Sequence, residues 1–543
     1  MSKLLLHNAK VYVDKGIYEE AVLIDGGRIA KVGKNDEVLA FVCDDTQVID
    51  CAGKTLIPGL NDTHLHFFQF GETLNQAPIE GVKSIDEMVE ICLKFAEEHP
   101  ETAANGIHAL GWNQDLFTSG EKRIPDRHDL DRISTEYPVM LERICGHINS
   151  CNTKMLEIAG ITADTPQPEG GEFEIGDDGI PNGIFKESAT KMVDYVIPGF
   201  ETEDYRRLIQ DAQKYALAHG LTTVQSNDIG STSFENLDEG FALIKDMLAK
   251  DELKIRYTSQ TCFKTADDLK NFIEKSDLWT ADYGEDPLFQ PGSVKMFRDG
   301  SLGGRTALLK NGYVPDRDNH GLEWHSMEQV RDYVKLANER GIPVVVHVIG
   351  DEAVDSVMQA FIEADPTGTN PCRNALIHCQ ITDNEILDRI VEHNIYVYAQ
   401  PIFIDYDMKI VEPLCGPELA ETSYAFGTLL RRGVHLSYGT DCPVESCNPF
   451  RNLYTAVTRK AVDGTPCGGW YAKECVDRET AIDAYTAESA YAEFLEDRKG
   501  RIKEGYYADL ALLSNDFFTC DEREILDITS DLTIVRGRIV HQK

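Results

Sequence analysis

Two histidines separated by a single residue, His64 and His66, directly follow the apolar stretch of residues 56–60. In an extended strand, side chains two residues apart project to the same side, so both imidazoles can reach one metal ion. Four further residues stand at or just beyond the ends of β-like apolar runs: Lys295, His347, His378 and Asp441. Imidazole and carboxylate groups suit zinc, and also manganese, iron or nickel. The six residues therefore predict an enzyme with a metal centre.

The lysine in this set needs separate treatment. An ammonium group has three donors and no lone pair, so Lys295 cannot be a ligand in that form. Carbamylation by carbon dioxide would convert it into N6-carboxylysine, a carboxylate that can bridge two ions. The alternative is an unmodified Lys295 that forms an ion pair with Asp299 or Asp441 beside a single ion. The sequence leaves both alternatives open.

The segments that must position these residues alternate apolar, strand-like runs with amphipathic helical stretches, as in a parallel sheet. One helix, between the fourth and fifth runs, has defined ends: Ser326 and Gln329 form a capping-box pair, and Gly341 follows the last turn. The eight runs cover residues 56–66, 222–225, 255–260, 293–297, 343–347, 375–378, 395–400 and 434–439. This α/β pattern predicts a (β/α)8 TIM barrel, in which the strand ends gather distant residues at one mouth. An open doubly wound sheet is disfavoured because no Gly-x-Gly-x-x-Gly follows an early strand.

Both ends of the chain have a different character, with short β-like pieces. Asp25-Gly26-Gly27 is a hairpin signal near the start, and Arg536-Gly537-Arg538 is a turn near the end. Neither end has enough strands for a sandwich, so residues 1–56 and 505–543 are predicted to form one composite β-sandwich domain. The barrel then occupies residues 57–504. An insertion at about 67–200, between the first two barrel strands, is predicted to be a lid or substrate wall.

Composition disfavours several classes of partner. The 92 acidic and 53 basic residues give a formal net charge of -39, whereas nucleic acids and anionic membranes bind concentrated Lys and Arg. The 14 cysteines include no Cys-x-x-Cys pair, which disfavours a zinc ribbon and fits a reducing cytosol. No apolar run approaches the roughly 18 residues of a membrane span. We expect a cytoplasmic protein with a small-molecule substrate, and a homodimer is a further expectation.

As a set, these motifs resemble the amidohydrolase superfamily. Its members place His-x-His on strand one, Lys on strand four, His on strands five and six, and Asp on strand eight. Residues 294–307 resemble the branch that includes N-substituted formamide deformylase. The resemblance covers essentially the whole chain and includes the split β domain. It rests on residues 58–66 (Pro-Gly-Leu-Asn-Asp-Thr-His-Leu-His), Lys295, His347, His378 and Gly439-Thr440-Asp441.

The resemblance implies metal-assisted hydrolysis with one or two divalent ions, zinc first among them. The ion would lower the pKa of a bound water towards roughly 7 and polarise the scissile carbonyl. Asp441 would take the proton from that water and pass it to the leaving nitrogen, while His378 would bind metal or steady the carbonyl oxygen. Segments that resemble family motifs supply five candidate substrate-binding residues: Trp112, His147, Glu187, Asp299 and Arg305.

The predicted function is that of a metal-dependent amidohydrolase acting on a carbon-nitrogen bond other than a peptide bond, such as an N-substituted amide or formamide. A cyclic amide or an N-acyl amino acid is the alternative substrate. A catalytically silent binding or regulatory protein on the same scaffold is the alternative of another class. The intact ligand set argues against silence, because a scaffold without catalysis would lose costly buried polar residues first.

Overall fold

The computed structural model describes residues 3–143, 147–168, 170–231 and 234–543, and its largest sheet has eight parallel strands. Neighbours in this sheet follow the order of the chain, so each strand pairs with the next. The strands are β8 (Leu60–Leu65), β14 (Leu221–Ser226), β15 (Arg256–Cys262), β16 (Phe289–Phe297), β17 (Val344–Val348), β18 (Ala375–His378), β19 (Tyr396–Ala399) and β20 (Leu436–Tyr438). Each predicted run overlaps one of these strands, so the prediction of a (β/α)8 barrel is confirmed.

The last strand returns to the first and closes the barrel. The Thr63 hydroxyl donates to the Tyr438 carbonyl at 2.9 Å, and the Asp441 N–H donates to the His64 carbonyl at 2.7 Å. Gly439 permits this approach, because a Cβ atom there would lie 2.6 Å from the His64 nitrogen. Barrel closure therefore brings the region of Asp441 directly onto the His64 strand.

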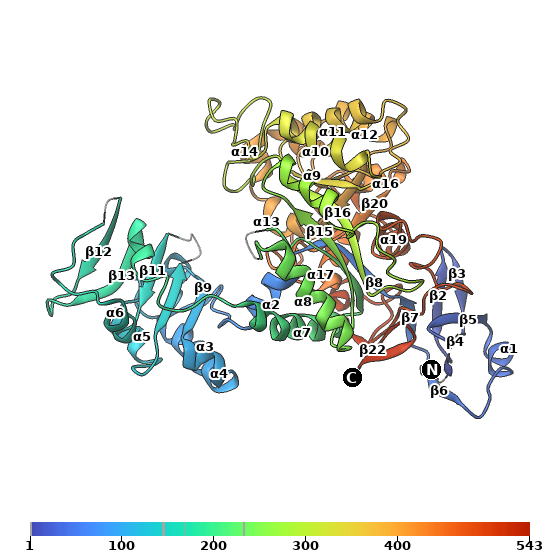
Figure 1. Cartoon of the computed structure of the whole chain (residues 1–543), viewed down its shortest axis with the longest axis horizontal. Coiled ribbons are helices and arrows are strands. Elements are labelled where there is room, and N and C mark those ends of the chain that lie inside the picture. The colour runs from blue at the N-terminus through green and yellow to red at the C-terminus, as the bar shows by residue number, and fades with distance from the viewer. Residues whose placement is uncertain (1–2, 144–146, 169, 232–233) are drawn as a thin grey trace. The chain divides into compact units, whose positions relative to one another are not determined.

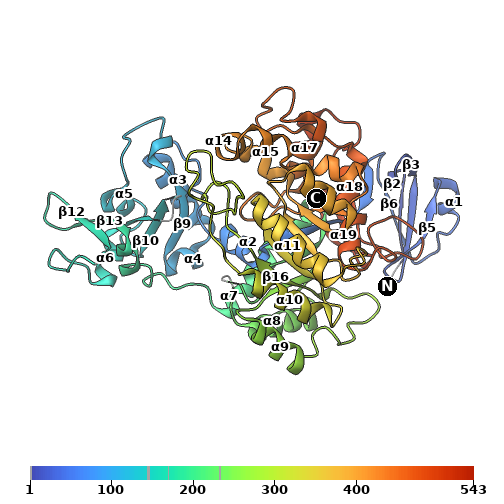
Figure 2. The same cartoon turned by 90° about the horizontal axis from the view of Figure 1, so that it is seen from above.

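Helices lie outside the strands, as Figures 1 and 2 show for α8 to α12. The predicted capping box is present: Ser326 Oγ accepts from the Gln329 N–H, and Gln329 Oε1 accepts from the Ser326 N–H at 2.8 Å. The barrel helices are α7 (Thr202–Ala218), α8 (Leu237–Ala249), α9 (Ala266–Lys275), α10 (Met327–Asn338), α11 (Asp351–Ala364), α12 (Asn384–Glu392), α16 (Phe426–Arg431), α17 (Pro449–Thr458), α18 (Arg478–Ala484) and α19 (Ala487–Ala492). No helix in the described ranges is both long and apolar enough to cross a membrane.

Strands from both ends of the chain form a separate β domain, as predicted. Its four-stranded sheet has the order β5-β4-β1-β6, with β1 (Lys3–His7), β4 (Ala21–Asp25), β5 (Arg28–Gly33) and β6 (Thr46–Asp50). Its six-stranded sheet has the order β23-β22-β21-β7-β2-β3, with β2 (Lys10–Asp14), β3 (Ile17–Glu19), β7 (Thr55–Pro58), β21 (Leu510–Leu513), β22 (Ser530–Val535) and β23 (Arg538–Gln542). Leu4 and Val22 of the first sheet share one buried core with Leu510 and Ile534 of the second.

The first predicted run proves to be two strands, because the chain changes sheets at Gly59. β7 belongs to the terminal domain and β8 to the barrel. Gly59 donates to the Asp509 carbonyl, and a Cβ atom at this position would lie 2.2 Å from the Thr222 hydroxyl oxygen. The Arg256 guanidinium binds both carboxylate oxygens of Asp509 at 2.7 and 3.0 Å, which ties the terminal domain to β15.

The insertion forms a second compact unit, Phe70–Asp211, with a core of its own. Its sheet has the order β12-β13-β11-β10-β9. The main elements are α3 (Ile85–Glu98), β9 (Ile107–Trp112), α5 (Arg127–Asp131), β10 (Val139–Arg143), β11 (Ile148–Cys151), α6 (Thr153–Ala159), β12 (Gly171–Ile175) and β13 (Pro181–Glu187). The lid role predicted for this segment stays a prediction.

Candidate metal centre

The six predicted ligands all stand at the carboxyl ends of barrel strands. Phe297 is in register with His347, and Val348 with His378, so the ends of strands four, five and six are aligned. The His347 and His378 rings have their centroids 4.5 Å apart, and those of His64 and His378 are 5.6 Å apart. Ligand atoms of His64, His66 and Asp441 all lie within 4.8 Å of one another. The structure thus brings together residues that are far apart in the sequence.

Each of the four histidines has one ring nitrogen held by an oxygen acceptor. Gln260 Oε1 lies 2.7 Å from His64 Nδ1, and Gln400 Oε1 lies 2.9 Å from His378 Nδ1. The amide nitrogen of each glutamine donates to a backbone carbonyl, which orients its oxygen towards the ring.

The other two rings are held by backbone carbonyls. His66 Nδ1 lies 2.9 Å from the Asn227 carbonyl, and His347 Nε2 lies 3.2 Å from the Gly300 carbonyl. A carbonyl oxygen can only accept, so the nitrogen facing it carries the proton and the other nitrogen keeps its lone pair. Such outer acceptors typically orient histidines that bind metal.

Asp441 Oδ1 is placed between two of these lone pairs. It lies 3.3 Å from His64 Nε2 and 3.2 Å from His66 Nε2. It is buried and accepts no hydrogen bond from the described part of the chain. Two ligand atoms at about 2.0–2.1 Å from a tetrahedral zinc ion stand roughly 3.3 Å apart. These three atoms therefore have the chemistry and the spacing of ligands to one small divalent ion.

The protonation states also suit a cation. Burial lowers the pKa of His64 to about 4 and that of His347 to about 3, so both rings are neutral at pH 7. Burial disfavours the charged form of Asp441, and the pKa of Asp441 falls well below its usual range only where His64 and His66 present protons to it. With both Nε2 atoms unprotonated, a bound cation would supply that stabilisation instead. Neutral imidazole and ionised carboxylate are the forms in which these groups bind metal.

Lys295 lies inside the same cluster. Its Nζ is 3.4 Å from His64 Nε2, and the residue is 2 % exposed. Burial lowers the pKa of Lys295 to about 8, so a sizeable fraction of the amine is neutral near pH 7 to 8. The Nζ also lies 4.6 Å from the centre of the Phe297 ring, a contact that favours the charged ammonium form.

Two of the predicted catalytic residues have a strained backbone. His378 has φ of 73° and Asp441 has φ of 57°, values in the left-handed region that residues with a Cβ rarely adopt. The buried Asp62 carboxylate braces this region by accepting from the N–H groups of His64 and Thr440 at 3.2 and 3.1 Å. Strain held in place by surrounding contacts is typical of functional sites.

Two candidate substrate-binding residues follow strand four. The Asp299 carboxylate is buried and accepts from the N–H groups of Leu308, Ile349 and Gly350 at 2.8 to 3.0 Å. Both of its oxygens accept from backbone groups and thereby support the loops after strands four and five. Its binding of substrate stays a prediction. Arg305 is exposed, and its binding of substrate stays a prediction.

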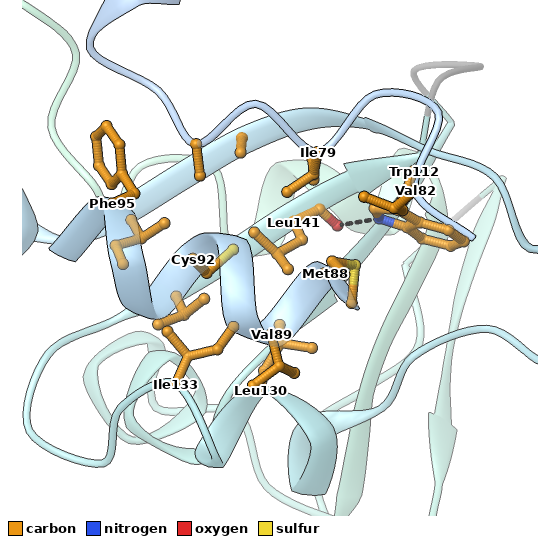
Figure 3. Close-up of a cluster of buried hydrophobic side chains, with 14 of the residues drawn as sticks. Ile79, Val82, Met88, Val89, Cys92, Phe95, Trp112, Leu130, Ile133 and Leu141 are labelled. Carbon is orange, nitrogen blue, oxygen red and sulfur yellow. Dashed lines mark hydrogen bonds between the residues drawn. The ribbon is translucent and has the colours of Figure 1, made fainter. Parts of the chain in front are cut away.

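The other three candidates lie in the insertion. Trp112 is fully buried in the insertion's core, and its indole N–H donates to the Leu141 carbonyl at 2.9 Å (Figure 3). Trp112 therefore packs in this core, and its contact with substrate stays a prediction. His147 and Glu187 are exposed and pair with each other at 3.0 Å. Their contact with substrate stays a prediction.

The residues that orient the ligands, above all Gln260 and Gln400, are not among the predicted site residues. Both are 1 % exposed, and each ends one of the predicted strand runs. A polar residue at the carboxyl end of an apolar barrel strand is a signal for the functional mouth. The position of each glutamine is visible in the sequence, but the sequence does not show which histidine each glutamine contacts.

An eight-stranded barrel with histidines and a carboxylate gathered at its strand ends defines the class of metal-dependent barrel hydrolases. The chain belongs to the Amidohydrolase family, which matches residues 47–541. It is 29 % identical over the full length of both chains to Bacillus subtilis YtcJ, which carries the name of an amidohydrolase.

It is 26 % identical to the N-substituted formamide deformylase of Arthrobacter pascens, over 100 % of this chain and 99 % of the relative. A crystal structure described as an uncharacterized metal-dependent hydrolase from Pyrococcus furiosus aligns with a TM-score of 0.74 at 27 % identity, covering 95 % of this chain and 100 % of the other.

Proposed function

We propose that this hydrolase cleaves a carbon-nitrogen bond other than a peptide bond, in an N-substituted amide or formamide. One observation carries the proposal: the His64 and His66 rings, each with Nδ1 facing an oxygen acceptor, flank a buried Asp441 oxygen that accepts no hydrogen bond within the described residues. Similarity to a relative named N-substituted formamide deformylase supports the choice of bond. A cyclic amide and an N-acyl amino acid are the alternative substrates to be included in the tests.

His64 and His66 would hold a divalent ion, with zinc proposed, through Nε2, with Asp441 Oδ1 as the third ligand atom. The ion would supply a lowered pKa of water and polarisation of the substrate carbonyl. Its positive charge would also keep the Asp441 carboxylate ionised before the reaction. We assign to this carboxylate the transfer of a proton from the attacking water to the leaving nitrogen. His378 Nε2 is assigned to a second ion, because its partner nitrogen faces Gln400 Oε1 and Nε2 therefore keeps its lone pair. The alternative role, steadying the carbonyl oxygen, would require a proton on Nε2.

We further propose that Lys295 is carbamylated and that the centre then holds two ions. The neutral amine attacks carbon dioxide, a carbon-nitrogen bond forms, and one proton leaves to solvent. The lowered pKa of Lys295 makes the neutral amine available. The product carboxylate would lie beside His64, whose Nε2 is 3.4 Å from Lys295 Nζ. An unmodified Lys295 beside one ion is the competing arrangement, and its charged form is favoured by the Phe297 ring.

The first test is the metal content per chain of protein purified without chelator or affinity nickel. Two equivalents, together with a carbamate signal after labelling with carbon-13 bicarbonate, support the bridged centre. One equivalent without that signal supports the unmodified lysine. A persistent absence of metal after supplementation with zinc or manganese contradicts the hydrolytic mechanism and favours the silent scaffold.

The second test is hydrolysis of a panel of N-substituted formamides, acetamides, cyclic amides and N-acyl amino acids. Asp441→Asn is expected to abolish turnover. Asp407→Asn is the matched control, because Asp407 is also a buried aspartate after a barrel strand but pairs with Tyr424 rather than with the ligand cluster. If only the cyclic amides or only the N-acyl amino acids are hydrolysed, that class of compound becomes the assigned substrate.

A further inference from the structure

The segment after strand four presents an unusually exposed tryptophan. The chain has four tryptophans, and Trp324 is 63 % exposed whereas Trp112 is fully buried. The neighbouring Leu322 is 64 % exposed. Large apolar side chains that are exposed side by side often mark a place where a ligand binds.

The backbone that carries Trp324 is held firmly. Its N–H donates to the Arg298 carbonyl at 3.0 Å. The Arg298 guanidinium, itself buried, binds the Glu323 carboxylate on one side of Trp324 and the His325 carbonyl on the other, the latter at 2.9 Å. The ring is therefore exposed on a fixed support, which is the property of a preorganised binding surface.

An unbroken series of ring contacts leads from Trp324 to the metal centre. The Trp324 ring stacks on Phe297, with centroids 5.0 Å apart and planes 27° apart. The Phe297 ring in turn lies 5.6 Å from the His347 ring and 4.6 Å from Lys295 Nζ. On the far side of the histidines, Phe403 meets the His378 ring at 5.8 Å. Aromatic surface thus begins beside the ligands and continues to solvent.

We propose that Trp324 and Phe297 form a subsite for a flat apolar substituent of the substrate, such as an aryl group on the amide nitrogen. This inference rests on the proposed function. A ring laid against Trp324 gains both burial of apolar area and a stacking contact. Trp324 is then a residue that determines specificity, and small N-alkyl amides lack the group that it binds.

The binding test uses phenylurea and methylurea, which share the amide-like head and differ in the ring. Isothermal titration calorimetry on the metal-loaded protein is expected to show phenylurea binding at least about tenfold more tightly than methylurea. Trp324→Ala should remove that preference, and Trp324→Phe should retain most of it. Phe41→Ala, a change at another exposed aromatic residue in the terminal β domain, is the control that should leave the preference intact.

The kinetic test compares formanilide with N-methylformamide. Trp324→Ala is expected to lower kcat/KM for formanilide about tenfold, mainly through KM, and to change it less than about twofold for N-methylformamide. Equal losses on both substrates, or equal binding of the two ureas by the wild-type protein, would overturn the subsite. If neither formamide is cleaved, the proposed function fails, but the urea titrations still decide on the subsite.

Discussion

Replacement of Gln260 tests whether the tautomer of a ligand histidine is set from outside the centre. Gln260→Met keeps the length of the side chain and removes the oxygen that lies 2.7 Å from His64 Nδ1. Without this acceptor the ring can place its proton on Nε2, the nitrogen that faces Asp441, and that proton must leave before a metal binds. Loss of such outer-shell contacts weakens metal binding about 10- to 100-fold, or about 1.4–2.7 kcal/mol.

The assay is competition for zinc between the metal-free protein and a chromophoric chelator. Gln225→Met is the matched control, because Gln225 is a glutamine of similar burial on the adjacent strand β14 that contacts Asn61 and Ser489 instead of a ligand. Gln260→Glu, which keeps an acceptor, should retain the affinity. Zinc binding by Gln260→Met within about twofold of wild type, or an equal loss in Gln225→Met, would refute the reasoning.

Three further predictions concern stability and barrel closure. Arg256→Met removes the ion-pair partner of the buried Asp509 carboxylate, which then keeps only the Arg536 N–H as a donor within the described residues, and should lower the free energy of unfolding by about 3–5 kcal/mol. Much of the loss should be recovered when Asp509 is also replaced by leucine. Urea unfolding measures the stability of the single and the double variant, and a loss below about 1 kcal/mol in Arg256→Met contradicts the prediction. Burial raises the pKa of Asp407 from 3.8 to about 6. The contribution of Asp407 to the free energy of unfolding is therefore fully present below about pH 4 and is lost as the pH rises through 6. The stability of Asp407→Asn relative to wild type should therefore rise by about 1.4 kcal/mol from pH 5 to pH 8, and a fall over that range disproves the assignment. Gly439→Ala would place a methyl carbon 2.6 Å from a backbone nitrogen of β8 and should lower both Tm and zinc affinity, whereas Gly468→Ala, with no atom within 4 Å of its added carbon, should change neither.

The barrel could be predicted because its strands are marked locally. Buried parallel strands are apolar-rich runs, and each run in this chain ends at or directly before a polar residue. The first run shows the limit of that signal. Residues 56–66 are predicted as one strand run, but the chain leaves one sheet for another at Gly59. At the change of sheet, Thr222 lies so close to Gly59 that no side chain fits at position 59. The sequence around Gly59 does not indicate this contact, because Thr222 is far away in the chain.

The substrate-binding residues show a different limit. Asp299 stands just after a barrel strand, where a carboxylate can serve a substrate or the backbone. Its three N–H donors come from residues 308, 349 and 350, and only folding places them around it. Trp112 likewise ends a strand of the insertion, and its burial depends on how that sheet packs against α3. The type of a residue therefore does not show whether its side chain contacts substrate or stabilises the surrounding backbone and core.

By itself, the sequence determined the order of the strands, the composite terminal domain and the set of ligand types, because apolar periodicity and side-chain chemistry are properties of short segments. Only the tertiary structure decided which ring nitrogens keep their lone pairs. Gln260 and His64 are 196 residues apart in the chain. The proton on His64 is fixed by that partner, and Asp441 reaches the same ring only through closure of the barrel. Such contacts depend on distances between segments that the chain order does not specify.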